Sequence, residues 1–227
     1  MESSALEYDG VIKNKEVYPQ YQASDIIQLS SINQHYPNKQ ALYDINLSIK
    51  NREIVFITGN SGAGKSTLLN IISGQLKPSS GTVCVDQKLF IASVFQDLKL
   101  IEEYTLIENL EIIFNSSVHI QDLIEYFNLK NLKNELVKNL CGGEKQKVAF
   151  IRALIAKPDI LIADEPTSAL DSHSANAMFE LISFYNVKKG LTVLWATHDS
   201  NMVKSFSGRC VHLDQGKIIH SGSTCFI

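Results

Sequence analysis

An eight-residue loop carries the clearest chemistry in this sequence. It reads Gly59-Asn60-Ser61-Gly62-Ala63-Gly64-Lys65-Ser66 and matches the pattern G-x-x-x-x-G-K-S. The glycines let successive backbone N–H groups point at phosphate oxygens, and a helix after the loop adds the positive end of its dipole. Lys65 supplies a full charge to the β- and γ-phosphates, and Ser66 offers a hydroxyl to Mg²⁺. The loop therefore predicts a nucleotide site, against the alternative of a chance glycine-rich turn before a lysine.

Two acidic residues, Asp164 and Glu165, follow the apolar run 160–163. At the end of a buried strand, the first carboxylate can hold Mg²⁺ and the second can orient or deprotonate an attacking water. Alone, such a pair is more often a helix N-cap beside a solvated charge. Combined with Lys65, it predicts a hydrolytic site in which Asp164 is the metal residue and Glu165 is the general base.

Strands and a helix must position these groups. Alternating apolar residues at 25–36 and 41–50 predict two strands of a sheet with one buried face, with a turn at 37–39 between them. The apolar run 53–58 enters the glycine-rich loop, and residues 66–73 have helical spacing. The loop is therefore expected to join a strand to a helix.

The second half of the chain predicts a mixed α/β arrangement. The continuous apolar runs 160–163 and 192–196 are typical of parallel strands that are buried on both faces. Residues from about 97 to 157 are mostly helical in pattern. Residues 210–213 and 217–220 flank a predicted hairpin turn.

Composition fits one domain with one nucleotide site. The 227 residues include 44% hydrophobic and 20% charged residues, with a formal net charge of −3. A sequence pI near 6.1 argues against a dedicated nucleic-acid binder. No apolar run approaches the roughly 20 residues of a membrane-spanning helix, so a membrane role is expected to come through a separate subunit. Residues 1–24 are polar and are expected to form an extension before a domain at 25–227.

With the loop and the acidic pair, five further segments make the chain resemble the ATP-binding cassette (ABC) ATPases from about Asp25 to the C-terminus. The segments are Tyr36 as an adenine-stacking aromatic, Phe95-Gln96 as the Q-loop, Leu140-Cys141-Gly142-Gly143-Glu144-Lys145-Gln146 as the signature, Ser168-Ala169-Leu170-Asp171 as the D-loop, and His198 as the switch histidine. Singly, a tyrosine or a histidine of this kind is more often structural. The order and spacing of the segments carry the resemblance.

The resemblance implies an α/β P-loop NTPase of the ABC type, with a RecA-like core sheet, an antiparallel β subdomain and an inserted α-helical subdomain at about 97–157. It implies hydrolysis of ATP to ADP and phosphate, with ATP and Mg²⁺ as cofactors. The expected catalytic residues are Glu165, His198 and Lys65, and the expected metal residues are Ser66, Gln96 and Asp164. The expected nucleotide contacts are Tyr36, Gly59, Asn60, Ser61, Gly62, Ala63, Gly64, Lys65, Ser66, Thr67, Gln96, Cys141, Gly142, Gly143 and Asp171.

The resemblance also implies partners. Gly142 and Gly143 precede a helix, so their N–H groups can form an anion site, which in this family faces the γ-phosphate held by a second subunit. The expected assembly is a head-to-tail dimer, a homodimer in the simplest case, with two sandwiched nucleotides beneath integral-membrane permease subunits. Asp171 is expected to communicate across the dimer. No nucleic-acid partner is expected.

Two features depart from the family pattern. Cys141 stands where the signature usually has serine, which caps the helix and donates to the partner's γ-phosphate. Loss of a good N-cap typically costs about 0.5–2 kcal/mol, so we expect slower hydrolysis or weaker closure than with serine. Gln96 lies only 31 residues after Lys65, shorter than is usual, which suggests that a peripheral strand or helix is missing.

Within the family, the segments 62–65, 94–97 and 105–110 are similar to those of bacterial lipoprotein-releasing, macrolide-efflux and cell-division ATPases. By analogy, the chain is expected to lie at the cytoplasmic face of an inner membrane, as the peripheral ATPase of an export or mechanotransmission system. Three alternatives are an importer subunit, a soluble ABC ATPase that acts on nucleic acid or ribosomes, and an interaction protein that binds ATP with little turnover. The sequence identifies no cargo.

Overall fold

A computed structural model describes residues 25–113 and 118–223, and the expected extension at 1–24 lies outside them. The first two strands form a long antiparallel hairpin, β1 (Asp25–Tyr36) and β2 (Lys39–Lys50), which β4 (Ser80–Val85) extends to a sheet of order β2-β1-β4. Both predicted strands are confirmed. β2 begins two residues earlier than predicted, because Tyr36 pairs directly with Lys39 and the turn shortens to Pro37-Asn38.

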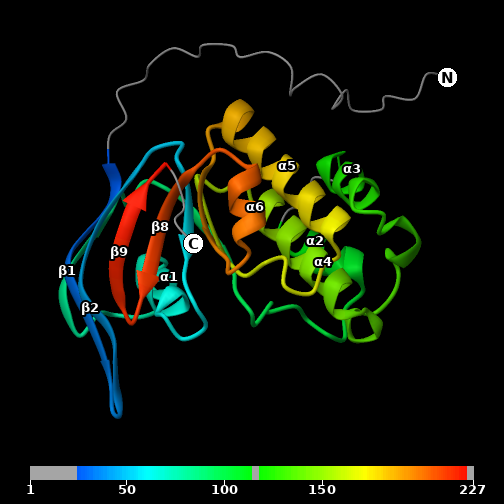
Figure 1. Ribbon diagram of the computed structural model, residues 1–227. Helices are drawn as coiled ribbons and strands as arrows, with labels where there is room; N and C mark the ends of the chain where they lie inside the picture. The colour runs from blue at the N-terminus through cyan, green and yellow to red at the C-terminus, as the bar shows by residue number, and fades with distance from the viewer. Residues whose placement is uncertain (1–24, 114–117, 224–227) are drawn as a thin grey trace.

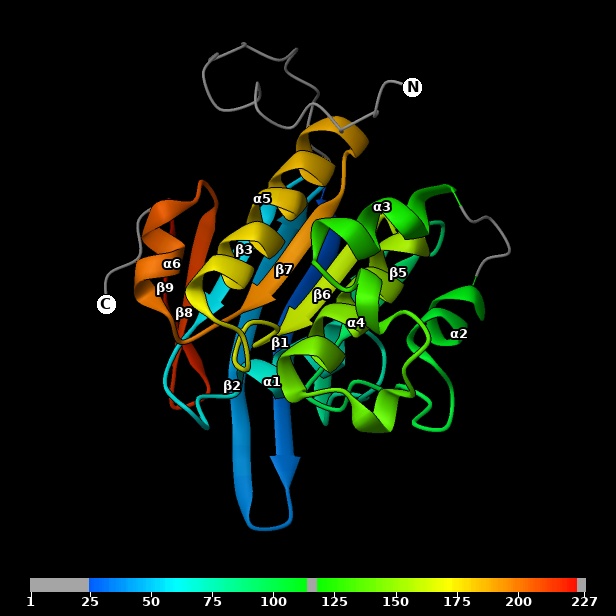
Figure 2. The ribbon, with the colours of Figure 1, turned by 90° about the vertical axis from the view of Figure 1, so that its right-hand side faces the viewer.

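A second sheet of six strands carries the loop and the acidic pair (Figures 1 and 2). Its strands, in spatial order, are β5 (Ile91–Val94), β6 (Ile160–Asp164), β7 (Thr192–Ala196), β3 (Ile54–Thr58), β8 (Arg209–Asp214) and β9 (Lys217–Gly222). The strands from β5 to β8 are parallel, and β9 returns antiparallel to β8 as the predicted hairpin. Strands β3, β6 and β7 are buried at every residue, which agrees with their continuous apolar runs.

The helix α1 (Lys65–Ile72) packs between the two sheets. Its side chains Leu68 and Leu69 are fully buried in a core shared with the β1–β2 hairpin and with one face of the parallel sheet. The segment from Lys65 to Gln96 also contains β4 and β5. The hairpin therefore folds over the start of α1, which is where the glycine-rich loop lies.

The other face of the parallel sheet is covered by helices (Figure 2). They are α2 (Leu106–Glu111), α3 (Val118–Tyr126), α4 (Gly142–Ile155), α5 (Ser172–Lys189) and α6 (Ser200–Ser205), with short 3₁₀ turns at Lys130–Leu132 and Val137–Asn139. In the core beneath α5, the ring of Phe179 lies 4.6 Å from that of Trp195 and 5.4 Å from that of Phe56.

The helices α2, α3 and α4 fall within the segment 97–157 that was predicted to be mostly helical. That the segment 97–157 forms a separate subdomain stays a prediction. Across the two described ranges of the chain, no helix combines the length and apolar character needed to cross a bilayer.

Candidate functional site

The glycine-rich loop, residues 59–64, turns sharply between β3 and α1. Gly59 has φ +143° and Gly64 has φ +107°, conformations that side-chain-bearing residues rarely adopt. A Cβ atom at Gly59 would lie 2.2 Å from the carbonyl oxygen of Leu213, and one at Gly64 would lie 2.9 Å from that of Ala41. Backbone conformation and close packing by β8 and β2 both require glycine here, so the loop's shape is fixed by its neighbours.

Lys65 places its ammonium group inside this loop. The residue is only 5% exposed, and its Nζ donates to the carbonyl oxygens of Gly59 at 2.8 Å and Asn60 at 3.2 Å. Nζ also lies 3.5 Å from Oε1 of Glu165. The structure thus joins the loop to the acidic pair, although 100 positions separate Lys65 from Glu165 in the sequence.

Parallel pairing explains why the distant residues meet. Asp164, the last residue of β6, pairs with Ala196, the last residue of β7, so His198 follows at the same edge of the sheet. On the other side, β5 ends opposite Ala163, and Gln96 follows two residues later with an exposed side chain. Ligand sites of open parallel sheets lie at the carboxyl ends of the strands, because the loops that follow converge there.

Asp164 has the environment expected of a metal ligand. It is 3% exposed, and its Oδ1 is buried without a hydrogen-bond partner in the described structure. Burial raises the pKa of the Asp164 carboxyl, and the hydrogen bond from the Ser66 hydroxyl offsets part of that effect. An unpaired buried carboxylate oxygen beside a hydroxyl fits Mg²⁺, which prefers oxygen ligands.

This protein surface supplies only part of a Mg²⁺ coordination shell. No group of three histidine, cysteine or acidic side chains suited to a metal occurs in residues 25–113 and 118–223. Ser66 and Asp164 would therefore share the ion with nucleotide phosphates and water, as Mg²⁺ sites commonly do. When bound, the ion would supply positive charge that neutralises phosphate charge.

Glu165 lies between two basic side chains. Its Oε1 faces Lys65, and its Oε2 lies 3.3 Å from Nδ1 of His198. The carboxylate is about one-fifth exposed, so solvent reaches it. A carboxylate in this place can orient a water and accept its proton, while His198, exposed at the site's edge, can hydrogen-bond a phosphate oxygen.

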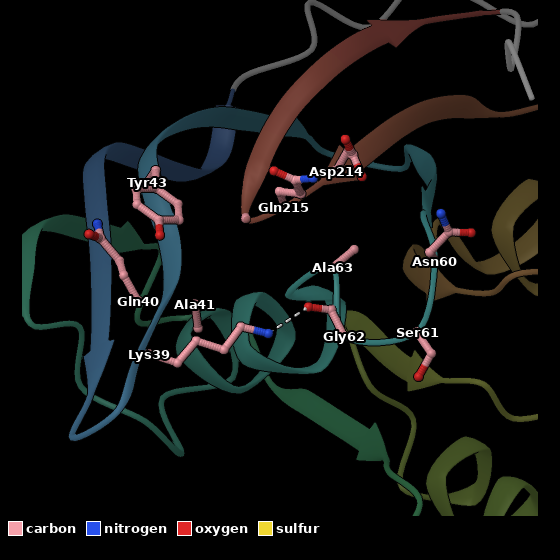
Figure 3. A pocket seen from close by; sticks show the side chains of 11 residues that line it. Lys39, Gln40, Ala41, Tyr43, Asn60, Ser61, Gly62, Ala63, Asp214 and Gln215 are labelled. Atoms are coloured by element: carbon pink, nitrogen blue, oxygen red, sulfur yellow. Dashed lines mark hydrogen bonds between the residues drawn. The ribbon is translucent and has the colours of Figure 1, made fainter.

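A cavity of about 420 Å³ opens beside the loop, between β2 and the β8–β9 turn (Figure 3). Lys39 directs its Nζ at the carbonyl oxygen of Gly62, 3.4 Å away. The turn is held in place by Gly216, whose N–H donates to Ala63 and whose carbonyl accepts from Tyr43. Tyr36, which pairs with Lys39 across the hairpin, is 45% exposed beside this region.

Sequence reasoning missed Lys39 and Tyr43 as lining residues of this cavity. No motif marks either residue, since both come near the loop only when the hairpin folds over α1. A positive side chain and an aromatic ring beside a phosphate-binding loop suit the base and ribose end of a nucleotide. Figure 3 shows the Lys39 side chain reaching across to Gly62.

The signature residues and Asp171 lie apart from the loop. Cys141 is the exposed N-cap of α4, and its N–H donates to Glu144 Oε2 at 2.7 Å. Asp171 is the N-cap of α5, where the N–H and the hydroxyl of Ser174 donate to its carboxylate and lower its pKa. In the described parts of the chain, neither Cys141 nor Asp171 hydrogen-bonds to residues 59–66. Their expected contacts with nucleotide stay predictions.

Comparisons with known proteins identify the family. The profile of the ABC transporter family matches residues 42–168. The methionine import ATP-binding protein MetN of Clostridioides difficile (strain 630) is 33% identical over 221 residues, covering 88% of this chain and 69% of that protein. MetN of Lactobacillus johnsonii is 35% identical over 224 residues, covering 86% and 64% respectively. The chain thus spans about two thirds of the length of these relatives.

Solved structures give the same result. The dimeric, post-hydrolysis structure of the ATP-binding cassette MJ0796 with ADP and Pi matches with a TM-score of 0.79 and 31% identity, covering 88% of this chain and all of that one. The ABC transporter cassette cbiO1 of Clostridium perfringens, part of the complex cbiONQ, matches with a TM-score of 0.73 and 27% identity, covering 88% of each chain. The predicted ABC-type P-loop fold is confirmed.

The predicted closeness to lipoprotein-releasing, macrolide-efflux and cell-division ATPases finds no support in these relatives, which are named for methionine import. That prediction depended on the segments 62–65, 94–97 and 105–110, which lie in the glycine-rich loop, at the end of β5 and at the start of α2, and none of them identifies a cargo. The chain belongs to the ABC transporter family and is an ATP-binding cassette that uses Mg²⁺ and ATP and hydrolyses ATP to power transport.

Proposed function

We propose that this chain is the ATPase subunit of an import-type transporter for methionine or a similar amino acid, working at the cytoplasmic face of a membrane beneath separate permease subunits. The observation that carries the direction of transport is the shared name of relatives that are 33–35% identical over most of the chain. The proposal replaces the expectation of an export system.

The site geometry supports specific roles for its residues. Lys65 holds the β- and γ-phosphates, and Ser66 and Asp164 hold Mg²⁺, because these groups converge at the start of α1. Glu165 accepts the proton of the attacking water, and His198, 3.3 Å from it, contacts the γ-phosphate. The closeness of Glu165 to Lys65 and His198 supports its role as the base in hydrolysis of a phosphate held by Lys65.

Two copies are proposed to close head to tail around two nucleotides. The first turn of α4 presents Cys141 and Gly142 to solvent at a helix N-terminus, where unpaired N–H groups favour an anion. Two solved structures of one similar cassette, MJ0796, are described as dimeric. A partner's γ-phosphate would meet this turn on closure, so ATP would hold the dimer together.

The dimer is tested with Glu165→Gln, which should bind Mg-ATP and stall before hydrolysis. Light scattering after size exclusion should show a monomer without nucleotide and a dimer with Mg-ATP. Lys65→Ala in the same background should stay monomeric under both conditions. A monomer that binds Mg-ATP at saturation would contradict the sandwich proposal for the isolated chain.

The direction of transport is tested with the chain and its permease in liposomes that contain Mg-ATP. Uptake of radiolabelled methionine should occur with wild type and be absent with Lys65→Ala. Uptake of another amino acid, with no uptake of methionine, would identify that amino acid as the cargo and would still support import. ATP-dependent release of a preloaded substrate would contradict import and favour an export system.

A further inference from the structure

One buried glutamine, Gln146 on α4, is bound to the segment that follows Asp164. The residue is 7% exposed. Its Nε2 donates to the carbonyl oxygen of Glu165 and to Oγ of Ser168, both at 3.2 Å, and its Oε1 accepts from the N–H of Ala169 at 3.1 Å. Both amide protons and the amide oxygen are thus used on one turn, residues 165–169.

That turn needs support because of the backbone conformation of Glu165. Glu165 has φ +50°, in the left-handed region that costs energy for a residue with a side chain. Its N–H donates to Ala196 at 3.0 Å, and its carbonyl accepts from the N–H of Ser168 at 3.1 Å. Gln146 adds a side-chain donor to the same carbonyl from a different element, so both α4 and β7 hold the residue.

Close packing fixes the same contact. A Cβ atom on Gly143, in the first turn of α4, would lie 2.8 Å from the carbonyl oxygen of Ala169. The helix therefore approaches the turn at backbone contact distance, and Gln146 bridges them one helical turn later. A small rotation of residues 165–169 would break the hydrogen bonds of Gln146 and move the Glu165 carboxylate away from Lys65 and His198.

We propose that Gln146 is a positioning residue for ATP hydrolysis, which holds residues 165–169 in the conformation that aims the Glu165 carboxylate at the attacking water. This inference rests on the proposed role of Glu165 as general base. Two donors and one acceptor are required at once, so glutamate fails as a replacement because it has no donor when ionised. Asparagine fails because it is one methylene shorter.

The effect should fall on turnover more than on nucleotide affinity. The side chain of Gln146 hydrogen-bonds to Glu165, Ser168 and Ala169, and in the described structure it makes no hydrogen bond to residues 59–66 or Asp164, so we expect ATP binding to change little without it. A misplacement of a catalytic group by about 1 Å can cost on the order of 100-fold in rate. We therefore expect Gln146→Met, which keeps the side-chain length, to lower kcat about 10- to 100-fold and to change the ATP Kd by less than about 3-fold.

A matched control distinguishes this role from general stabilisation. Asn186, near the C-terminus of α5, donates to the carbonyl oxygens of Arg52 and Leu191 at 2.8 and 2.7 Å, far along the chain from the turn. Asn186→Ala removes two comparable hydrogen bonds and should leave kcat within about 2-fold of wild type. If it lowers kcat as much as Gln146→Met does, the proposal is wrong.

The decisive experiment is a double-mutant cycle with Glu165→Gln, read by single-turnover hydrolysis of radiolabelled ATP. Because Gln146 is proposed to act through Glu165, Gln146→Met should lower the residual rate of Glu165→Gln by less than about 2-fold. If Gln146→Met lowers the rate of Glu165→Gln by the same factor as it lowers the rate of wild type, the proposal is wrong. A single Gln146→Met variant with wild-type kcat would also overturn it. If Glu165→Gln alone keeps wild-type kcat, the base assignment fails, and this inference fails with it.

Gln146→Glu gives an independent measurement if Gln146→Met does not fold. It should reduce kcat to a similar degree at neutral pH, and its kcat should recover partly as the pH falls, since a protonated carboxyl regains one donor. Wild type has no such recovery at this position. If Gln146→Glu folds and is slow but its kcat does not rise as the pH falls, the result would count against the requirement for a donor.

Discussion

Replacement of Asp164 by asparagine should stabilise the nucleotide-free protein while it impairs hydrolysis. The carboxylate is 3% exposed, and one of its oxygens is buried without a hydrogen-bond partner in the described structure. A buried unsatisfied polar group costs about 1–3 kcal/mol, and more when it is charged. The amide of asparagine carries no charge, but it would still lack some hydrogen-bond partners. We therefore expect Asp164→Asn to raise the free energy of unfolding by about 1 kcal/mol, which corresponds to about 2–4 °C in Tm for a chain of this length.

The gain should depend on pH. Burial raises the pKa of the Asp164 carboxyl above its ordinary value of 3.8. Ionised Asp164 therefore destabilises the folded protein at any pH above the raised pKa, and the penalty fades as the pH falls through that value toward 3.8. The stability difference between Asp164→Asn and wild type should be largest at pH 8 and should shrink in acid.

With Mg-ATP bound, wild type should be more stable than Asp164→Asn, the reverse of the order expected without nucleotide. A ligand at about 100 times its Kd stabilises the folded state by about 2.7 kcal/mol, and the variant should lose the part of that gain that Mg²⁺ contributes. Urea unfolding at pH 8 and pH 5, with and without Mg-ATP, measures both effects. Asp159→Asn is the control, since Asp159 is exposed and already accepts from the N–H of Phe90. An Asp164→Asn variant less stable than wild type at pH 8 without nucleotide would refute the reasoning.

Three further predictions test other parts of the structure. Cys141→Ser should restore a stronger N-cap to α4, with a gain of about 0.5–1 kcal/mol in urea unfolding and a kcat at least about 2-fold higher; unchanged ATPase activity would count against a role for the cap. Gly59→Ala should abolish ATP binding by fluorescence titration, because its Cβ would meet Leu213 O at 2.2 Å, and retained micromolar binding would show that the loop can adapt. Phe179→Ala should cost about 3–5 kcal/mol in unfolding free energy through the cavity left against Trp195, and a loss under 1 kcal/mol would indicate that the core collapses around it.

Much of the site was readable from the sequence because its chemistry is local. The segment 59–66 combines glycines, a lysine and a serine within eight residues, so its residue types alone predict phosphate binding and a metal contact. Asp164 and Glu165 end an apolar strand, and the resemblance to ABC ATPases supplied His198. The predicted likeness to export systems finds no support in the relatives, which are named for methionine import.

The sequence by itself predicted which residues could bear the chemistry and determined which segments form buried parallel strands, since both follow from residue type and period. It could not show that Glu165 lies between Lys65 and His198, that Lys39 reaches the loop at Gly62, or that Gln146 holds the turn after Asp164. Those contacts join residues 19 to 100 positions apart in the chain or depend on one sheet folding over another. The strand order β6-β7-β3, the packing of α4 against residues 165–169 and the folding of the β1–β2 hairpin over α1 bring them together.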